Sequence, residues 1–137
     1  MSKKYILGID PGSSKTGVAL VDESGNIFKV EVILKENFKN DILDFLVSAV
    51  PEVCVIGDGT TSSTMQETLK KLFPSLNMFV INEAHSTEEA RGLYWKLNPP
   101  KGLRKLFPIG MQTPPINLDG YAAAVLARRF LASEGCK

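Results

Sequence analysis

Apolar residues near the start of the chain gather in short runs that polar and glycine-containing segments separate. Residues 5–10 form an apolar run beside glycines, which indicates a buried strand. Residues 16–21 and 27–34 are rich in β-branched side chains, and the polar segment 22–26 between them is typical of a hairpin loop. The pattern predicts three successive antiparallel strands.

After residue 37 the hydrophobic pattern alternates between helical spacing and short buried runs. Apolar residues recur at helical spacing over 40–50, before Pro51, which is expected to end that helix. Further helices are predicted at 63–73, 87–96 and 119–133, and further strands at 53–57 and 78–82. Residues 97–117 carry five prolines and two glycines, so a long irregular connection is expected there, of the kind that is often functional.

This order predicts an α/β fold with a mixed five-stranded sheet flanked by helices. The 137 residues are expected to form a single domain, 1–137, large enough to bury a core without disulfides. The apolar share of 44% and the charged share of 23% are typical of globular proteins.

The sequence lacks the marks of membrane insertion or export. It has no apolar run of about 18 residues that would predict a membrane span, and its N-terminus does not resemble a signal peptide. The two cysteines, Cys54 and Cys136, do not form a disulfide framework. A cytoplasmic protein without a membrane partner is the expectation.

Charge is distributed unevenly although the formal net charge is only +1. Residues 1–89 hold eight Lys or Arg and thirteen Asp or Glu, whereas residues 90–137 hold eight and two. Such asymmetry favours a polyanionic partner, and a dipolar surface without function is the alternative.

Three acidic residues stand at the boundaries of predicted elements. Asp10 ends the first strand and precedes a turn with Gly12, Glu83 follows the strand 78–82, and Asp119 begins the last helix. Groups beyond strand ends line ligand crevices in α/β sheets. Clustered carboxylates repel one another, and a hard divalent cation such as Mg²⁺ relieves the repulsion. The alternatives are a solvated turn residue, a surface carboxylate and a helix N-cap, respectively.

Several segments resemble known motifs. Residues 6–20, ILGIDPGSSKTGVAL, resemble the first motif of the RuvC-type Holliday-junction resolvases and of the YqgF/RuvX family. Residues 82–90, NEAHSTEEA, resemble the second YqgF motif, and residues 55–60, VIGDGT, are similar to a Gly-x-Gly-Thr turn of YqgF-like domains. Residues 99–129 resemble a Pro-Pro-basic-Gly loop that leads into an Asp-x-Tyr-Ala-Ala helix.

The resemblance implies a ribonuclease H-like fold and a nuclease that depends on Mg²⁺ or Mn²⁺ and acts on structured nucleic acid. It makes Asp10, Glu83 and Asp119 the catalytic, metal-binding acids, and it places Lys15 at the basic position of the first motif. The implied substrate is precursor 16S ribosomal RNA or a branched DNA junction, and the choice between monomer and homodimer stays open. The family often has acids where this chain has Asn82 and Gly120.

Four basic residues in or beside the irregular connection are candidates for contacts to a nucleic-acid backbone. They are Lys96, Lys101, Arg104 and Lys105, and a solvated loop is the alternative. Tyr94 and Trp95 are candidates for stacking on a base or for packing in the core. His85 could assist proton transfer or lie on the surface, and Asp58 could bind a metal or stabilise a turn.

Two other functions compete with the nuclease. The first turn also resembles the phosphate motif of ATP-binding actin-like and sugar-kinase domains, although those proteins use two such domains around the nucleotide. The missing acids at Asn82 and Gly120 favour a ribonuclease H-like module that binds nucleic acid without cleaving it.

Overall fold

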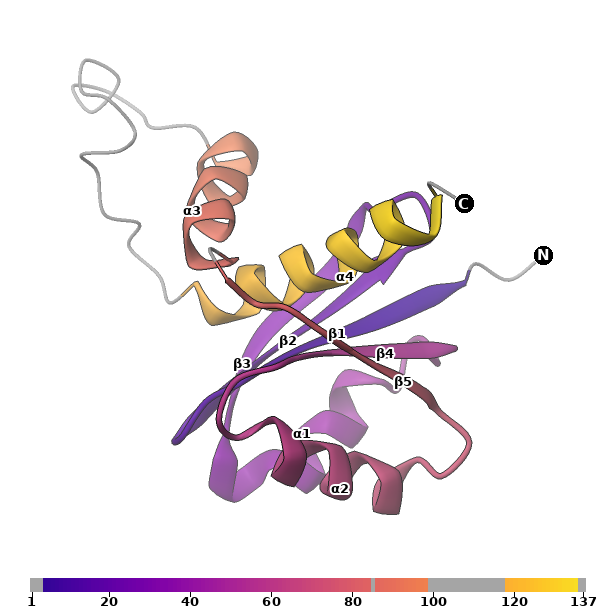
Figure 1. The fold of residues 1–137 in the computed structure, drawn as a ribbon. Helices are drawn as coiled ribbons and strands as arrows, with labels where there is room; N and C mark the ends of the chain where they lie inside the picture. Colours follow the sequence, from indigo (N-terminus) through magenta and orange to yellow (C-terminus); the bar gives the residue numbers. More distant parts are fainter. Residues whose placement is uncertain (1–3, 85, 99–117, 136–137) are drawn as a thin grey trace.

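The computed structural model describes residues 4–84, 86–98 and 118–135 of the chain (Figure 1). The strands are β1 (Tyr5–Pro11), β2 (Lys15–Asp22), β3 (Ile27–Leu34), β4 (Val53–Gly57) and β5 (Asn77–Ile81). The helices are α1 (Phe38–Phe45), α2 (Ser62–Leu72), α3 (Ser86–Leu97) and α4 (Asp119–Gly135), with a 3-10 helix, η1 (Lys35–Asn37), before α1.

The five strands form one mixed sheet in the order β3-β2-β1-β4-β5. β1 pairs antiparallel with β2, and β2 pairs antiparallel with β3. β4 lies parallel to β1, and β5 lies parallel to β4. The carboxyl ends of β1, β4 and β5 therefore share one edge of the sheet, and the predicted mixed five-stranded sheet is confirmed.

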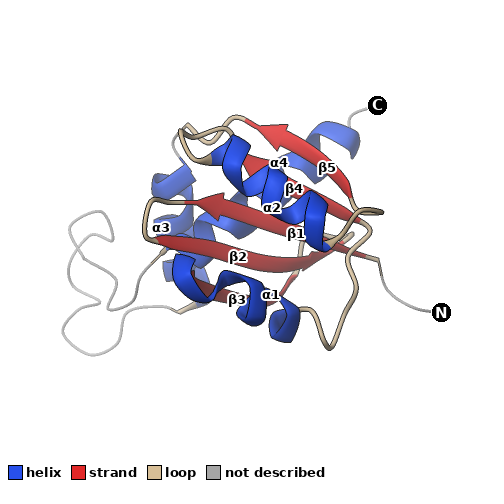
Figure 2. Cartoon of the chain, turned by 90° about the horizontal axis from the view of Figure 1, so that it is seen from below, coloured by secondary structure: helices blue, strands red, loops and turns tan. Residues whose placement is uncertain are grey.

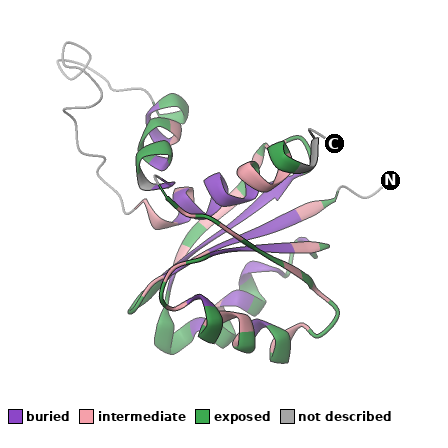
Figure 3. Cartoon of the chain, in the orientation of Figure 1, coloured by how far each residue is buried: buried purple, intermediate pink, exposed green. Residues whose placement is uncertain are grey.

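Helices cover both faces of the sheet, because side chains alternate between the faces along each strand. Leu7 and Ile9 of β1 belong to a core with residues of α1 and α2, which lie on the face turned toward the viewer in Figure 2. Ile6 belongs to a second core with the alanines of α4 on the opposite face. In Figure 3 the central strands are mostly buried and the edge strand β5 is not.

The expected elements are present, and most of their ends lie close to the predicted positions. The main difference is the first helix, predicted at 40–50 and observed as Phe38–Phe45. After Phe45 the chain tightens, since the N–H of Val47 donates to the carbonyl oxygen of Asp44 (3.3 Å). Val47 and Val50 are 79% and 82% exposed, so burial does not favour a longer helix.

Several earlier predictions fall on residues outside those described. The irregular connection of 97–117 lies outside them from residue 99 onward, and so does His85. Within the described ranges, the helices lack the length and hydropathy that a membrane span requires.

Candidate functional site

Asp10 lies near the carboxyl end of β1, on the face of the sheet that α4 covers. Ile6 packs in the α4 core, and the alternation of side chains along β1 places Asp10 on the same face. Its antiparallel partner on β2 is Gly17, and on the other side the parallel register with β4 brings it next to Gly57. Asp10 is therefore flanked by two residues that have no side chain.

Each of these glycines leaves room for one of the other predicted acids. A Cβ atom on Gly17 would overlap the carbonyl oxygen of Asp119, so the first turn of α4 rests directly on β2 beside Asp10. A Cβ atom on Gly57 would overlap Oε2 of Glu83, and one on Gly59 would overlap Oε1 of the same carboxylate. The structure therefore brings Asp10, Glu83 and Asp119 together although they are far apart in the sequence.

The electrostatics of Asp10 reflect this proximity. Burial, the charges of Glu83 and Asp119, and a close contact with the Glu83 carboxyl raise the pKa of Asp10 from 3.8 to about 7. Within the described residues, Oε2 of Glu83 is buried and has no hydrogen-bond donor. The carboxyl groups of Asp10 and Glu83 thus lie in contact with no hydrogen-bond donor of the described residues between them. A shared proton or a bound cation would relieve the repulsion between these two groups.

The donor set suits a hard divalent cation, because Mg²⁺ and Mn²⁺ prefer carboxylate oxygens. The buried Glu83 oxygen that lacks a donor supports the same fit. Across the described parts of the chain, however, no three or more His, Cys, Asp or Glu side chains form a ready-made metal site.

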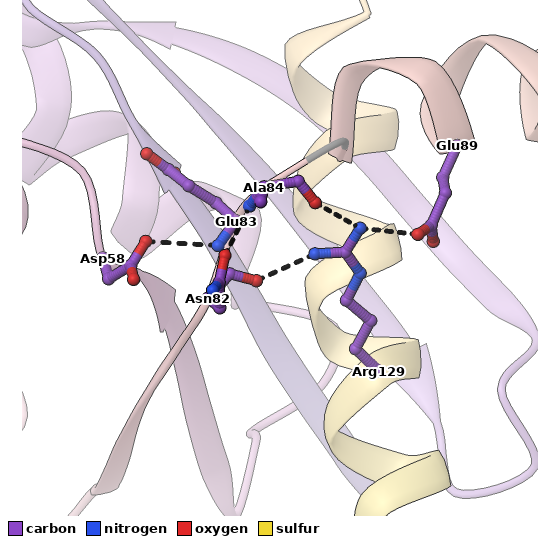
Figure 4. A network of polar contacts seen from close by, with 6 residues as sticks. All are labelled: Asp58, Asn82, Glu83, Ala84, Glu89 and Arg129. Carbon is purple, nitrogen blue, oxygen red and sulfur yellow. Dashed lines mark hydrogen bonds and ion pairs between the residues drawn. The ribbon is translucent and has the colours of Figure 1, made fainter.

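Arg129 of α4 fixes the segment that carries Glu83 (Figure 4). Its guanidinium donates to the carbonyl oxygens of Asn82 (2.8 Å) and Ala84 (2.7 Å), on either side of Glu83. The same group pairs with the carboxylate of Glu89 on α3 (2.5 Å). Sequence reasoning missed this role, since the residues lie more than 40 positions apart and no spacing pattern links them.

Two polar side chains also accept hydrogen bonds from the backbone at Glu83 and Ala84. Oδ1 of Asp58 accepts a hydrogen bond from the N–H of Glu83 (3.1 Å), which supports the turn-stabilising interpretation. Oδ1 of Asn82 accepts one from the N–H of Ala84 (2.7 Å). Gly120, where the family often has an acid, is buried against the backbone of Glu31, which leaves little space for a side chain there.

The predicted nucleic-acid contacts are divided between several places. Lys15 is exposed at the start of β2, next to the turn that follows Asp10. Lys96 is exposed near the C-terminal end of α3, about 15 Å along the helix axis from Ser86 at its start. It lines a groove together with Arg128. Lys101, Arg104 and Lys105 lie outside the described residues.

Tyr94 and Trp95 are buried, so the proposal that they stack on an unpaired base is not supported. Their rings meet edge to face at 5.1 Å between centroids, and Tyr94 meets Tyr121 of α4 in the same way at 5.5 Å. Their exposed fractions are 8% and 4%. Tyr94 instead contributes to the contact between α3 and α4, and Trp95 packs against Tyr94.

No family model matches the chain, and no curated protein matches it. A solved structure of the Fowlpox virus resolvase with its Holliday junction DNA superposes with a TM-score of 0.62 and 17% identity, covering 95% of this chain and 98% of that one. RuvC from Thermus thermophilus superposes with a TM-score of 0.53 and 16% identity, covering 96% of each chain. A putative sugar kinase from Cytophaga hutchinsonii has a TM-score of 0.45 and 19% identity, and this chain spans 38% of its length.

The Fowlpox virus resolvase and the RuvC structure match this chain over nearly its whole length. With the sheet order β3-β2-β1-β4-β5 they show that the chain has the ribonuclease H-like fold of RuvC, as predicted. At these identities the likeness concerns the fold.

Proposed function

We propose that this chain is a metal-dependent nuclease that hydrolyses phosphodiester bonds in structured nucleic acid. The observation that carries the proposal is the convergence of Asp10, Glu83 and Asp119 at one edge of the sheet. Structural acids are normally kept apart or neutralised by basic partners, because like charges at short range raise the free energy. Here burial, followed by the charges of Glu83 and Asp119, raises the pKa of Asp10, so this site disfavours the charged form of its first acid.

The residues have distinct parts in this proposal. Asp10, Glu83 and Asp119 would hold Mg²⁺ or Mn²⁺, which supplies Lewis-acid activation of water and charge stabilisation at the phosphorus. Arg129 and Asp58 keep the Glu83 segment in place. Lys15, next to the turn after Asp10, neutralises the backbone of the bound strand. Water attacks the phosphorus and one P–O bond breaks, which leaves a phosphate monoester and a hydroxyl.

The substrate that we favour is a branched DNA junction. This rests on the fold shared over nearly the full length with two structures, one of which is described as a resolvase bound to Holliday junction DNA. Precursor 16S ribosomal RNA is the alternative substrate, and it rests on the likeness of the motifs around Asp10 and Glu83 to the YqgF family.

A second candidate function is nucleic-acid binding without cleavage. It is favoured by two observations: the described residues include no ready-made metal site, and Asn82 and Gly120 stand where the family often has acids. This function predicts binding that weakens with salt and no cleavage in any divalent ion.

A cleavage panel separates these functions. The substrates are a four-way DNA junction, a DNA duplex, single strands and precursor 16S ribosomal RNA fragments, each tested with Mg²⁺, Mn²⁺ and a chelator. We expect metal-dependent cleavage of the junction by the wild type and by Asp44→Asn, an exposed acid on α1, and none by Asp10→Asn. Equal cleavage by Asp10→Asn would exclude the proposed site, and no cleavage in any condition would favour the binding module.

A further inference from the structure

A cavity of about 500 Å³ lies between α1 and α2, on the face of the sheet opposite the carboxylates. This volume is within the range of small-ligand sites, about 300–1,000 Å³. Phe38 and Met65 line it together with polar and basic residues, which include Thr16, Lys35, Asn37, Lys39, Thr61 and Thr64. Glu36 is the one acid among the described lining residues, so the two lysines leave the lining with net positive charge.

The first turns of two helices form walls of this cavity. Asn37 and Lys39 belong to the start of α1, and Thr61 and Thr64 to the start of α2. Among the described atoms, no side-chain hydrogen bond caps either helix, and the first turn of α2 contains no acid. The N-terminal end of a helix carries partial positive charge and presents N–H groups, so the start of α2 favours an anion in the cavity. The start of α1 does so less, because its first turn contains Asp41.

Thr16 provides a separate indication of a ligand. It is 1% exposed, its side chain lies on the α1 and α2 face of β2, and it lines the cavity. Its Oγ1 is buried and has no hydrogen-bond partner among the described residues. A buried hydroxyl without a partner is costly, and a phosphate oxygen that reached Oγ1 from the cavity would provide the missing acceptor.

The cavity is connected to the carboxylate site through the turn between β1 and β2. Thr16 pairs with Pro11, the residue directly after Asp10, and Gly12 of the same turn lines the cavity. The N–H of Lys35 donates to the carbonyl oxygen of Ser14 (2.9 Å), which ties the basic wall to this turn. A strand that crosses the end of the sheet at Asp10 can therefore reach the cavity across the turn.

We infer that this cavity binds a backbone phosphate of the nucleic-acid strand, a few nucleotides from the bond that is cleaved. The inference rests on the proposed function for its source of phosphate, whereas the anion site itself rests on Thr16, the two lysines and the two helix starts. Phosphate contacts of this kind fix the position of a strand without reading its sequence.

The test measures binding without a divalent ion, so that it does not depend on cleavage. Inorganic phosphate and a short oligothymidylate are titrated into the full chain, and the amide resonances of Thr16, Asn40 and Thr64 are followed by NMR. We expect both probes to shift these resonances and inorganic phosphate to compete with the oligonucleotide.

Two variants and a matched control accompany the titration. Lys35→Ala/Lys39→Ala and Thr16→Val should each weaken oligonucleotide binding, the double variant by about tenfold, because charge-assisted contacts to phosphate are lost. Lys70→Ala/Lys71→Ala removes the same charge at the exposed far end of α2 and should change the affinity less than about twofold, since salt screens distant charges. Thr16→Val should retain the Tm of the wild type, because it removes a hydroxyl that has no partner.

The outcomes separate the two proposals. Equal oligonucleotide affinities in the wild type, the two cavity variants and the control would overturn the cavity assignment and leave the nuclease proposal standing. Oligonucleotide binding that leaves the amide resonances of Thr16, Asn40 and Thr64 unshifted would have the same consequence. Binding of inorganic phosphate without oligonucleotide binding would overturn the assignment to a nucleic-acid strand. Cavity binding together with a complete absence of cleavage would support the cavity and contradict the nuclease.

Discussion

Asp10 is held in an environment that disfavours its charge. Its pKa of about 7 in the folded chain exceeds the ordinary value of 3.8, and the causes are burial and the neighbouring Glu83 and Asp119. The folded state therefore binds more protons than the unfolded state between about pH 4 and pH 7. The stability that protonated Asp10 provides is complete below about pH 4, falls as the pH rises to about 7, and is lost above that value.

Asp10→Asn should abolish this pH dependence. An amide at this position carries no charge at pH 8, so we expect a Tm above that of the wild type by about 3 °C, from relief on the order of 1 kcal/mol. The measurement is thermal unfolding of both proteins at pH 5 and pH 8, with Asp44→Asn as the control. A wild type whose Tm does not fall relative to Asp10→Asn between these pH values would show that the folded chain does not disfavour the charge of Asp10.

Arg129 is predicted to act through the backbone that carries Glu83. Arg129→Met removes the bonds to Asn82 and Ala84, so metal affinity and kcat should fall by about 10-fold to 100-fold, as for other groups that orient metal ligands. Arg129→Lys should restore part of the loss. The exposed neighbour Arg128 supplies the control Arg128→Met, and equal metal binding by all four proteins would contradict this role.

At the scale of elements, glycines in β2 and β4 determine how closely α4 and the Glu83 segment approach Asp10. Gly57→Ala places a methyl group against the Glu83 carboxylate and near Leu126. We expect weaker divalent-ion binding and a lower Tm, because the neighbours of a close-packed residue relax only in part.

Gly92→Ala is the matched control for Gly57→Ala. Of the described atoms, none lies within 4 Å of a Cβ at this position on α3, so the substitution should raise stability by up to about 1 kcal/mol through helix propensity. Calorimetric titration with Mn²⁺ and thermal unfolding compare the variants. A Gly57→Ala protein with wild-type metal affinity would show that Glu83 does not need this space.

The order of the elements could be predicted from the sequence. The spacing of hydrophobic residues differs between helices and strands, and in most elements these residues lie on the face that the structure buries. The strand at 27–34 was predicted with both ends correct. The first helix was predicted too long, since the pattern does not show that Val47 and Val50 face solvent. η1 was not predicted, because a single 3-10 turn has no hydrophobic period.

The site was predictable only in part. The three acids, Asp10, Glu83 and Asp119, stand at the ends of predicted elements. An acid at such a position does not pack in the core, so the sequence alone indicates it as a candidate for a site. The contributions of Arg129 and Thr16 depend on contacts between distant segments and on the absence of a hydrogen-bond partner. Neither property leaves a spacing pattern in the chain.

At the scale of the whole molecule, the formal charge of +1 combines an acidic segment with a basic one. Lys101, Arg104 and Lys105 belong to the basic segment. Replacing all three with Ala should lower the slope of log K against log salt by about 2 to 3, at about 0.9 for each lost phosphate contact on B-form DNA.

The salt slope is measured by titrating a labelled DNA junction with the chain at several salt concentrations. Lys70→Ala/Lys71→Ala controls for the loss of positive charge as such, since it removes two lysines from the last turn of α2. A slope that is unchanged in the triple variant would show that these basic residues do not contact the backbone.

The central claim is that Asp10, Glu83 and Asp119 together bind a divalent ion, and the Mn²⁺ binding isotherm tests it most directly because it needs no choice of substrate. We predict saturable Mn²⁺ binding by the wild type and by Asp44→Asn, and at least about tenfold weaker binding by Asp10→Asn, Glu83→Gln and Asp119→Asn. Wild-type affinity in these three variants would contradict the claim.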